Sequence, residues 1–445
     1  MIPRETQPLI SNAELEKILI SFESEDPSWF HQIRQIAREE LKNNGFPDFK
    51  TEQGSYTPWD KVLLPLKFSG RPIERFSANT DLLSSLDWNQ IESVIGQWPY
   101  RIVMLNGQYS IQHSILPSGL EIESIRSVLK NSLNIPIQSM FSKLNLKELG
   151  PVLNLACFKD GFYLHFKSNQ CLDYPLVMLH IATQAQDYFS CSHNVIVMDE
   201  YSSGTILEYF ISGNEDQSSL NSEMTQIYLR PQSQLAHAAA YLNGIHKNQW
   251  SFQTVEQQSG SSFSSRIFIL GGAWTRHEQV IALKQPQASC GLEGLWMTQD
   301  HQQAENYTFI DHQAPNCTSR EKFKGIANHD SVGVFDGCIL VRENSMKTDA
   351  SQENKNILLS SNAQIYSKPQ LKIYADDVKC SHGSATGQLD AEALFYLQSR
   401  GIHPEAAQQM LIDGFSREIV DAIPWPEFKT SIWNRVNQFY KGNSK

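Results

Sequence analysis

Short apolar runs separated by polar, turn-like residues dominate the chain from about residue 151 to residue 375. Runs of this length, bounded by Ser, Asn, Gln and Gly, are typical of β-strands joined by turns. No helical periodicity lies between them, which disfavours an ordinary parallel sheet with helical crossovers. The pattern predicts a sandwich, a propeller or a β-solenoid, and the lack of a strict repeat disfavours the propeller. Examples of these runs are VMLHIA (177–182), NVIVMD (194–199), RIFIL (266–270), QVIALK (279–284) and VGVFDGCILV (332–341).

The N-terminal part of the chain has a helical pattern instead. Asp26 is a predicted N-cap, Pro27 suits the first helical position, and Gly45 is a predicted stop. Residues 46–150 are mixed, with a helix expected in the leucine-rich stretch Leu82–Ile95. We therefore predict an N-terminal helical and mixed domain over residues 1–150, followed by the β domain over 151–375.

The C-terminal part, residues 376–445, is predicted to be a helical domain. Its apolar residues recur at helical spacing, and capping residues and glycines mark the ends of four helices. The predicted helices begin at Asp390, His403-Pro404, Ser416 and about Pro426, and the first two end at Gly401 and near Gly414.

The composition changes the balance between sandwich and solenoid. Charged residues make up 19% of the 445 residues, below the ~25% of ordinary domains, while Ser, Thr, Asn and Gln are abundant. In a parallel β-helix, equivalent positions of successive coils stack ~4.8 Å apart. Stacked like charges repel, whereas amides and hydroxyls can form hydrogen-bonded ladders. The composition therefore favours a solenoid, although a general enrichment of the sequence in glutamine would produce the same composition in another fold.

Several protein classes are disfavoured at the same time. No apolar stretch approaches the ~18 residues of a membrane span, and the start MIPRETQPLISNAELEK lacks the pattern of a secretory signal. The net charge of −11 offers no attraction to nucleic acid. Seven widely spaced cysteines without a CxxC pair indicate a reducing compartment, so we expect a cytoplasmic protein. There is no GxxxxGK[ST] phosphate-binding loop.

Cys380 and His382 form a C-x-H pair in the segment KPQLKIYADDVKCSHGSATGQLD (368–390), where the strands give way to helices. If one strand carries both residues, their side chains share a face. A thiolate beside an imidazole suits Zn²⁺, Fe²⁺ or an iron–sulfur cluster, and the missing ligands would come from distant residues or another chain. Two other interpretations stay open: a buried cysteine with an ordinary hydrogen-bonded histidine, or a cysteine nucleophile with a histidine base.

Other candidate groups carry weaker signals. Asp376 and Asp377 could act as a carboxylate pair, but neighbouring strand residues face opposite sides, so solvated side chains beside a turn are favoured. The remaining cysteines lie in or beside apolar runs and are predicted to be core residues rather than ligands. They are Cys157, Cys171, Cys191, Cys290, Cys317 and Cys338.

Three blocks of the sequence resemble one known family. The run 368–402, with ADDVKCSHG, GQLD and ALFYLQSRGI, resembles the C-terminal signature of the SufB/SufD family, the scaffold of the SUF iron–sulfur cluster assembly machinery. The stretches MKTDASQENKNILLSSNAQI (346–365) and GFPDFKTEQGSYT (45–57) resemble two further conserved blocks. The last of these departs from the family at Gly54-Ser55, where a Trp and a basic residue are usual.

The C-terminal signature also indicates a branch of the family. Gly383 follows His382 and the chain continues into GQLD, which fits the SufD branch better than the SufB branch, where Glu is typical at that position. The signature departs slightly at Ser384-Ala385-Thr386, where Ala-Thr-Val is usual.

The resemblance implies a right-handed parallel β-helix flanked by N-terminal and C-terminal helical domains. It implies a noncatalytic subunit that pairs with a SufB-like chain through the β-helix and docks a SufC-like ATPase through residues 390–445. It also implies a part in iron supply and in building the nascent cluster at the interface with the SufB-like chain, with no nucleotide bound here. His382 is then the expected ligand of iron or cluster, with Cys380 beside it. Because exposed strand edges favour pairing, an isolated chain could form a homodimer.

Two other functions fit a β-helix. A polysaccharide lyase or hydrolase is usually exported and carries clustered acids along one face. The missing signal pattern and the few acids over residues 250–340 disfavour it. The other is an inert structural dimeric solenoid, in which Cys380 and His382 bind nothing.

Overall fold

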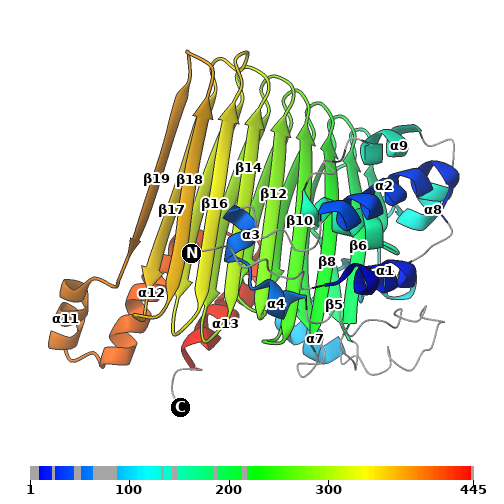
Figure 1. The fold of residues 1–445 in the computed structure, drawn as a ribbon. Coiled ribbons are helices and arrows are strands. Elements are labelled where there is room, and N and C mark those ends of the chain that lie inside the picture. Colours follow the sequence, from blue (N-terminus) through cyan, green and yellow to red (C-terminus); the bar gives the residue numbers. More distant parts are fainter. Residues whose placement is uncertain are drawn as a thin grey trace, which may run out of the picture.

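The protein is a parallel β-solenoid with helices at both ends of the chain (Figure 1). In this computed structural model the described residues are 10–22, 26–44, 52–63, 88–131, 135–142, 144, 148–183, 188–212 and 218–441. Two sheets, of ten and nine strands, run the length of the molecule. The solenoid is therefore the correct choice among the three β architectures that the sequence pattern allowed.

The chain alternates between the two sheets. From β4 onward, each strand pairs in parallel with the strand two positions away along the chain, so two strands make one coil. The ten-stranded sheet contains β1 (Tyr100–Leu105), β2 (Gln108–Tyr109), β5 (Leu176–Ala182), β7 (Ser203–Ser212), β9 (Gln234–Tyr241), β11 (Ser262–Ile269), β13 (Ser289–Thr298), β15 (Thr318–Ala327), β17 (Asp349–Leu358) and β19 (Lys379–Gly387). The nine-stranded sheet contains β3 (Glu121–Ser124), β4 (Phe162–Phe166), β6 (Tyr188–Met198), β8 (Ser219–Leu229), β10 (Lys247–Gln257), β12 (Trp274–Leu283), β14 (Gln303–His312), β16 (Val332–Val341) and β18 (Gln364–Ile373).

Stacked side chains fill the interior between the two sheets. One column of register partners is aliphatic throughout. Burying its side chains stabilises the fold by about 25 cal/mol for each Å² of apolar surface removed from water. Its members are Ile196, Ile227, Val255, Ile281, Ile310, Ile339 and Leu371. This column runs through most of the coils, which explains why short apolar runs recur along the sequence.

Other interior columns are polar and bond from coil to coil. The Gln279 amide donates to Gln253 at 2.7 Å, and the Gln352 amide donates to Glu321 at 2.6 Å, each pair being register partners on adjacent strands. Most buried polar groups in proteins have a hydrogen-bond partner of this kind. The surplus of neutral polar residues is thus partly explained by hydrogen-bonded ladders inside the solenoid.

Helices cover the outer faces of both sheets. The N-terminal helices pack on the nine-stranded sheet around buried Trp250 and Trp274, and α7 and the C-terminal helices pack on the ten-stranded sheet around Tyr209 and Phe268. The helices are α1 (Asn12–Ser21), α2 (Ser28–Asn44), α3 (Glu52–Tyr56), α4 (Trp59–Val62), α7 (Trp88–Ile95), the short 3₁₀ helix η1 (Ile111–His113), α8 (Ile125–Lys130), α9 (Ile135–Ser142), α10 (Leu149–Cys157), α11 (Ala391–Ser399), α12 (Pro404–Val420) and α13 (Pro426–Lys441).

The C-terminal helices begin largely where the sequence predicts. The carboxylate of Asp390 caps α11 by accepting from the backbone N–H groups of Glu392 at 2.9 Å and Ala393 at 3.3 Å. Pro404 opens α12 and Pro426 opens α13. The predicted stop at Gly45 and the first part of the predicted helix Leu82–Ile95, residues 82–87, lie outside the described residues.

One prediction about these helices is wrong. The helix expected to end near Gly414 and the one expected to begin at Ser416 are a single helix, α12. A glycine within a helix costs only about 1 kcal/mol relative to alanine. Ile412 and Ile419, on either side of Gly414, are both buried against the sheet, and this packing outweighs the local cost.

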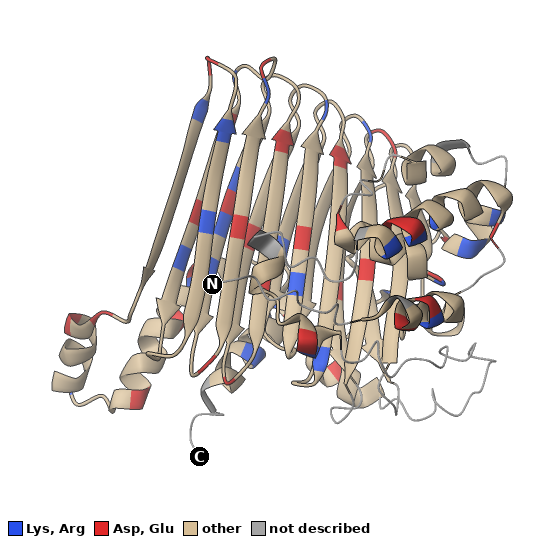
Figure 2. Cartoon of the chain, in the orientation of Figure 1, with Lys and Arg blue, Asp and Glu red and all other residues tan. Residues whose placement is uncertain are grey.

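Charged residues of both signs are mixed along the strands on one face of the solenoid. Figure 2 shows Lys and Arg interspersed with Asp and Glu along the strands, without a broad area of one sign on the face drawn. In the described parts of the chain, no helix is both long and apolar enough to cross a membrane.

Candidate functional site

The C-x-H pair lies on β19, the last strand of the ten-stranded sheet (Figure 1). β19 pairs with β17 on one side only, and no described strand pairs with its other edge. β18 has the same position at the end of the other sheet. Cys380 and His382 therefore stand at the open end of the solenoid, on a strand whose backbone groups are free to pair with another chain.

Cys380 and His382 face the interior side of this last coil. The neighbouring side chains of the same parity identify the face: Ser384 Oγ is 2.7 Å from Ser367 Oγ of β18, and Thr386 Oγ1 accepts from Asn356 of β17 at 3.2 Å. One strand, β19, therefore carries both candidates, and it places them on one face.

His382 continues an interior polar column. Its register partner on β17 is Gln352, whose partner on β15 is Glu321. Gln352 is buried and donates to the Glu321 carboxyl, whose pKa is raised to about 7 by burial. His382 itself is exposed because no further coil covers it. The imidazole is therefore accessible to an ion or a partner at the mouth of the solenoid.

Cys380 is half-buried against the interior core. Like Val378 and Leu371, it packs against the buried apolar cluster of the interior. Burial raises the pKa of the Cys380 thiol, and the charge of Asp349 raises it further. A thiol of raised pKa is protonated at neutral pH, so this site does not hold a preformed thiolate. This disfavours the cysteine nucleophile, and a metal bound here would have to displace a proton.

We expect alkylation of Cys380 to depend on pH accordingly. Because only the thiolate reacts, its rate of modification by iodoacetamide should still be rising above the ordinary thiol pKa of about 8.5. Pulse labelling from pH 6.5 to 10, read by peptide mass spectrometry, measures this, with exposed Cys171 as the reference for reagent reactivity. A rate that reaches its plateau below pH 8 would show a stabilised thiolate and would revive the nucleophile interpretation.

The weaker candidates take ordinary structural positions. Asp376 and Asp377 are exposed in the turn before β19, and Asp377 forms an ion pair with Lys347, as expected of solvated residues beside a turn. All seven cysteines are free. Cys171 is exposed, unlike the core residue that was predicted, whereas the others outside the C-x-H pair are buried: Cys157, Cys191, Cys290, Cys317 and Cys338.

Sequence reasoning missed a second group of ligand-type side chains. His180 of β5, Glu208 of β7 and Glu223 of β8 place their ligand atoms within 4.8 Å of one another inside the first coils. No set of three such residues in the described ranges includes Cys380 or His382. No sequence motif marks the three residues, because only the register of the coils brings them together.

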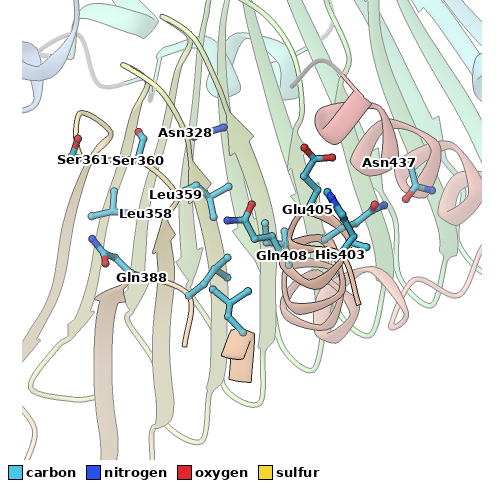
Figure 3. Close-up of a pocket in the computed structure, with 15 residues that line it drawn as sticks. Asn328, Leu358, Leu359, Ser360, Ser361, Gln388, His403, Glu405, Gln408 and Asn437 are labelled. Carbon is cyan, nitrogen blue, oxygen red and sulfur yellow. The ribbon is translucent and has the colours of Figure 1, made fainter. Parts of the chain in front are cut away.

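A cleft of about 830 Å³ lies between the last coils and the C-terminal helices. Figure 3 shows Leu358, Leu359 and Ser360 at the end of β17 on one side, and Glu405 and Gln408 of α12 on the other. α11 stands at its rim and has no buried residue. This part of the molecule therefore has room for a binding partner.

Comparisons with known proteins point to one family. Residues 180–415 match the family model described as "SUF system FeS cluster assembly, SufBD core domain". The chain is 28% identical to the iron–sulfur cluster assembly protein SufD of Escherichia coli over 429 residues, covering 95% of this chain and 96% of that protein. It is 28% identical over 335 residues to a SufBD family protein of Synechocystis, covering 73% of this chain and 74% of the relative. It is 25% identical over 415 residues to the chloroplastic protein ABCI7 of Arabidopsis thaliana, covering 91% and 85%.

Proposed function

The chain belongs to the SUF system FeS cluster assembly family with the SufBD core domain, and on this premise we propose that it is a noncatalytic, SufD-like subunit of a SUF assembly complex. The observation that carries the proposal is the position of Cys380 and His382 on a strand edge at the open end of the solenoid. Two ligands at an edge form half of a site, which a second chain can complete.

The second chain in this proposal is a SufB-like subunit that pairs through the end of the β-helix. The edges of β18 and β19 have no partner among the described strands, and β-strand addition would satisfy their backbone groups. The cargo is iron or a nascent iron–sulfur cluster, held by His382 and Cys380 together with ligands of the partner. In isolation the same edges would let two copies of this chain form a homodimer.

A SufC-like ATPase is the proposed third component, docked on the helices of residues 390–445. α11 projects Phe395 and Tyr396, which are 74% and 57% exposed, beside the cleft described above. Exposed aromatic side chains next to a cleft are typical of protein interfaces. The nucleotide would belong to this ATPase and not to the present chain.

We also propose that the complex works in the cytoplasm, within a reducing compartment. All seven cysteines are free, including the exposed Cys171 and the half-buried Cys380, which would be open to oxidation elsewhere. Cys380 can bind iron only while its thiol is reduced.

Co-expression with a SufB-like and a SufC-like chain tests the proposed function. We expect a stable three-component complex that binds iron and acid-labile sulfide after anaerobic reconstitution, whereas the chain alone should bind little cluster. Gel filtration with light scattering, together with iron and sulfide analysis, measures both properties. A chain that remains separate from both partners would contradict the proposal.

A further inference from the structure

A cluster of two histidines and two glutamates lies inside the first coils of the solenoid, far along the chain from Cys380. His180 Nε2 is 3.4 Å from Glu208 Oε2, and His180 Nδ1 is 3.5 Å from Glu223 Oε2. His237 Nε2 is 3.4 Å from Glu208 Oε1. The four residues come from β5, β7, β8 and β9, so the cluster joins both sheets across the interior.

Neighbouring side chains hold these groups in place. The ring of Phe210 stacks on His180 at 4.3 Å between centroids. Asn194 donates to Glu223 Oε1 at 2.7 Å, which leaves Oε2 facing His180. Ser265 Oγ lies 2.8 Å from His237 Nδ1, which leaves Nε2 facing Glu208. Outer contacts that orient imidazoles and carboxylates in this way are a general feature of metal sites.

The hydrogen-bonding capacity of the cluster is incompletely used. His237 is 1% exposed, and its Nε2 has no hydrogen-bond partner although it points at a carboxylate. His180 Nε2 is buried and unpartnered as well. A neutral imidazole carries one N–H and cannot donate to two carboxylates at once. Buried polar atoms of this kind are normally paired, so their number here requires an explanation.

A small cavity opens next to the cluster. Its volume is about 30 Å³, and the residues that line it include His180, Glu223, Asn106, Gly107 and Asn243. This is room for a single ion or water molecule. No lysine or arginine is among the described residues that line it, so the wall supplies no cationic side chain of that type to balance the carboxylates.

We infer that His180, Glu208 and Glu223 bind one divalent first-row transition-metal cation inside the solenoid, with His237 orienting Glu208. Imidazole nitrogen and carboxylate oxygen together suit Zn²⁺, Fe²⁺, Co²⁺ or Mn²⁺, whereas Mg²⁺ and Ca²⁺ prefer oxygen alone and Cu⁺ prefers sulfur. The ligand atoms lie within 4.8 Å of one another, so small side-chain movements would bring them to coordination distance. The inference does not depend on the proposed assembly function.

The competing interpretation is a buried ion cluster in which a protonated His180 bridges the two carboxylates. That arrangement would hold the same side chains together without a metal. The two interpretations differ in whether the protein takes up one metal ion at this position.

Metal titration of the full chain distinguishes them. The chain is stripped of metal with a chelator. It is then titrated with Zn²⁺, followed by calorimetry, and with Co²⁺, followed by visible absorption.

A Cys380→Ala/His382→Ala variant should keep one equivalent of bound metal, and its Co²⁺ spectrum should lack a thiolate charge-transfer band. Glu208→Gln and Glu223→Gln should each weaken binding tenfold or more. Bound Zn²⁺ should raise the thermal unfolding midpoint of the wild type and of the Cys380/His382 variant, because a ligand that binds only the folded state stabilises it.

Glu321→Gln is the matched control. Glu321 is also a buried interior carboxyl that accepts a bond from a neighbouring coil, but it lies outside the cluster. Its replacement should leave Zn²⁺ affinity unchanged.

Loss of all Zn²⁺ binding in the Cys380/His382 variant overturns the inference. Unaltered Zn²⁺ affinity in both Glu208→Gln and Glu223→Gln overturns it as well. Glu223 provides the safer of the two variants, because burial raises the pKa of its carboxyl and a neutral amide is therefore the smaller change there.

Discussion

Replacing His382 by alanine is expected to lower the iron and sulfide content of the reconstituted complex by about tenfold, the scale of loss seen when a metal site is weakened. His382 is exposed at the mouth of the solenoid, so the change removes a proposed ligand without opening a cavity. Substitutions at such surface positions usually alter the free energy of unfolding by about 0.5 kcal/mol or less. Iron and sulfide analysis together with thermal unfolding of the isolated chain measures the two effects separately.

His301→Ala is the control for this experiment. His301 is also exposed, in the turn before β14, and lies at no strand edge of the solenoid end. Its replacement should leave cluster content unchanged. If the His382 variant retains its full content of iron and sulfide, the ligand role is wrong and the pair is a structural feature of the last coil.

Removing the aromatic rings of α11 is expected to weaken binding of the SufC-like ATPase by tenfold or more. The variant Phe395→Ala/Tyr396→Ala loses two side chains of the kind that dominate protein interfaces when they become buried. α11 has no buried residue, so the helix should still form behind its Asp390 cap. Calorimetry or surface plasmon resonance with the purified ATPase measures the affinity.

The double variant tests the docking surface more specifically than deletion of residues 390–445 would. α12 and α13 bury Ile419, Phe428 and Ile432 against the ten-stranded sheet, and deleting them would expose that apolar face. Tyr174→Ala offers a matched control, since Tyr174 is 59% exposed in the connection before β5. Unchanged ATPase affinity in the α11 variant, with the control also unchanged, would place the docking surface elsewhere.

The predictions from sequence succeeded where the deciding interactions are local. Asp390 caps α11 because its side chain reaches backbone groups two and three residues later, and such contacts are visible in the sequence itself. Gly414 failed as a helix stop because burial of Ile412 and Ile419 in a distant sheet determines the course of α12. Local propensity is a weak term that packing can override.

The two candidate sites differ in the same way. Cys380 and His382 are two residues apart on one strand, so a strand's alternation is enough to place them on one face. His180, Glu208 and Glu223 lie on three different strands, two in the ten-stranded sheet and one in the nine-stranded sheet. Their meeting depends on coil length and strand register, neither of which follows from periodicity.

Patterns among neighbouring residues were enough to predict the order of helical, β and helical segments, the preference for a stacked solenoid and the family signature around Cys380 and His382. These follow from strand alternation, caps and neutral polar composition, which are properties of neighbouring residues. Only the folded chain reveals the register of the coils, the open edges of β18 and β19, and the enclosure of His180 with two glutamates. A shift of one residue in any coil would turn its interior side chains outward, so these features depend on packing of the whole stack.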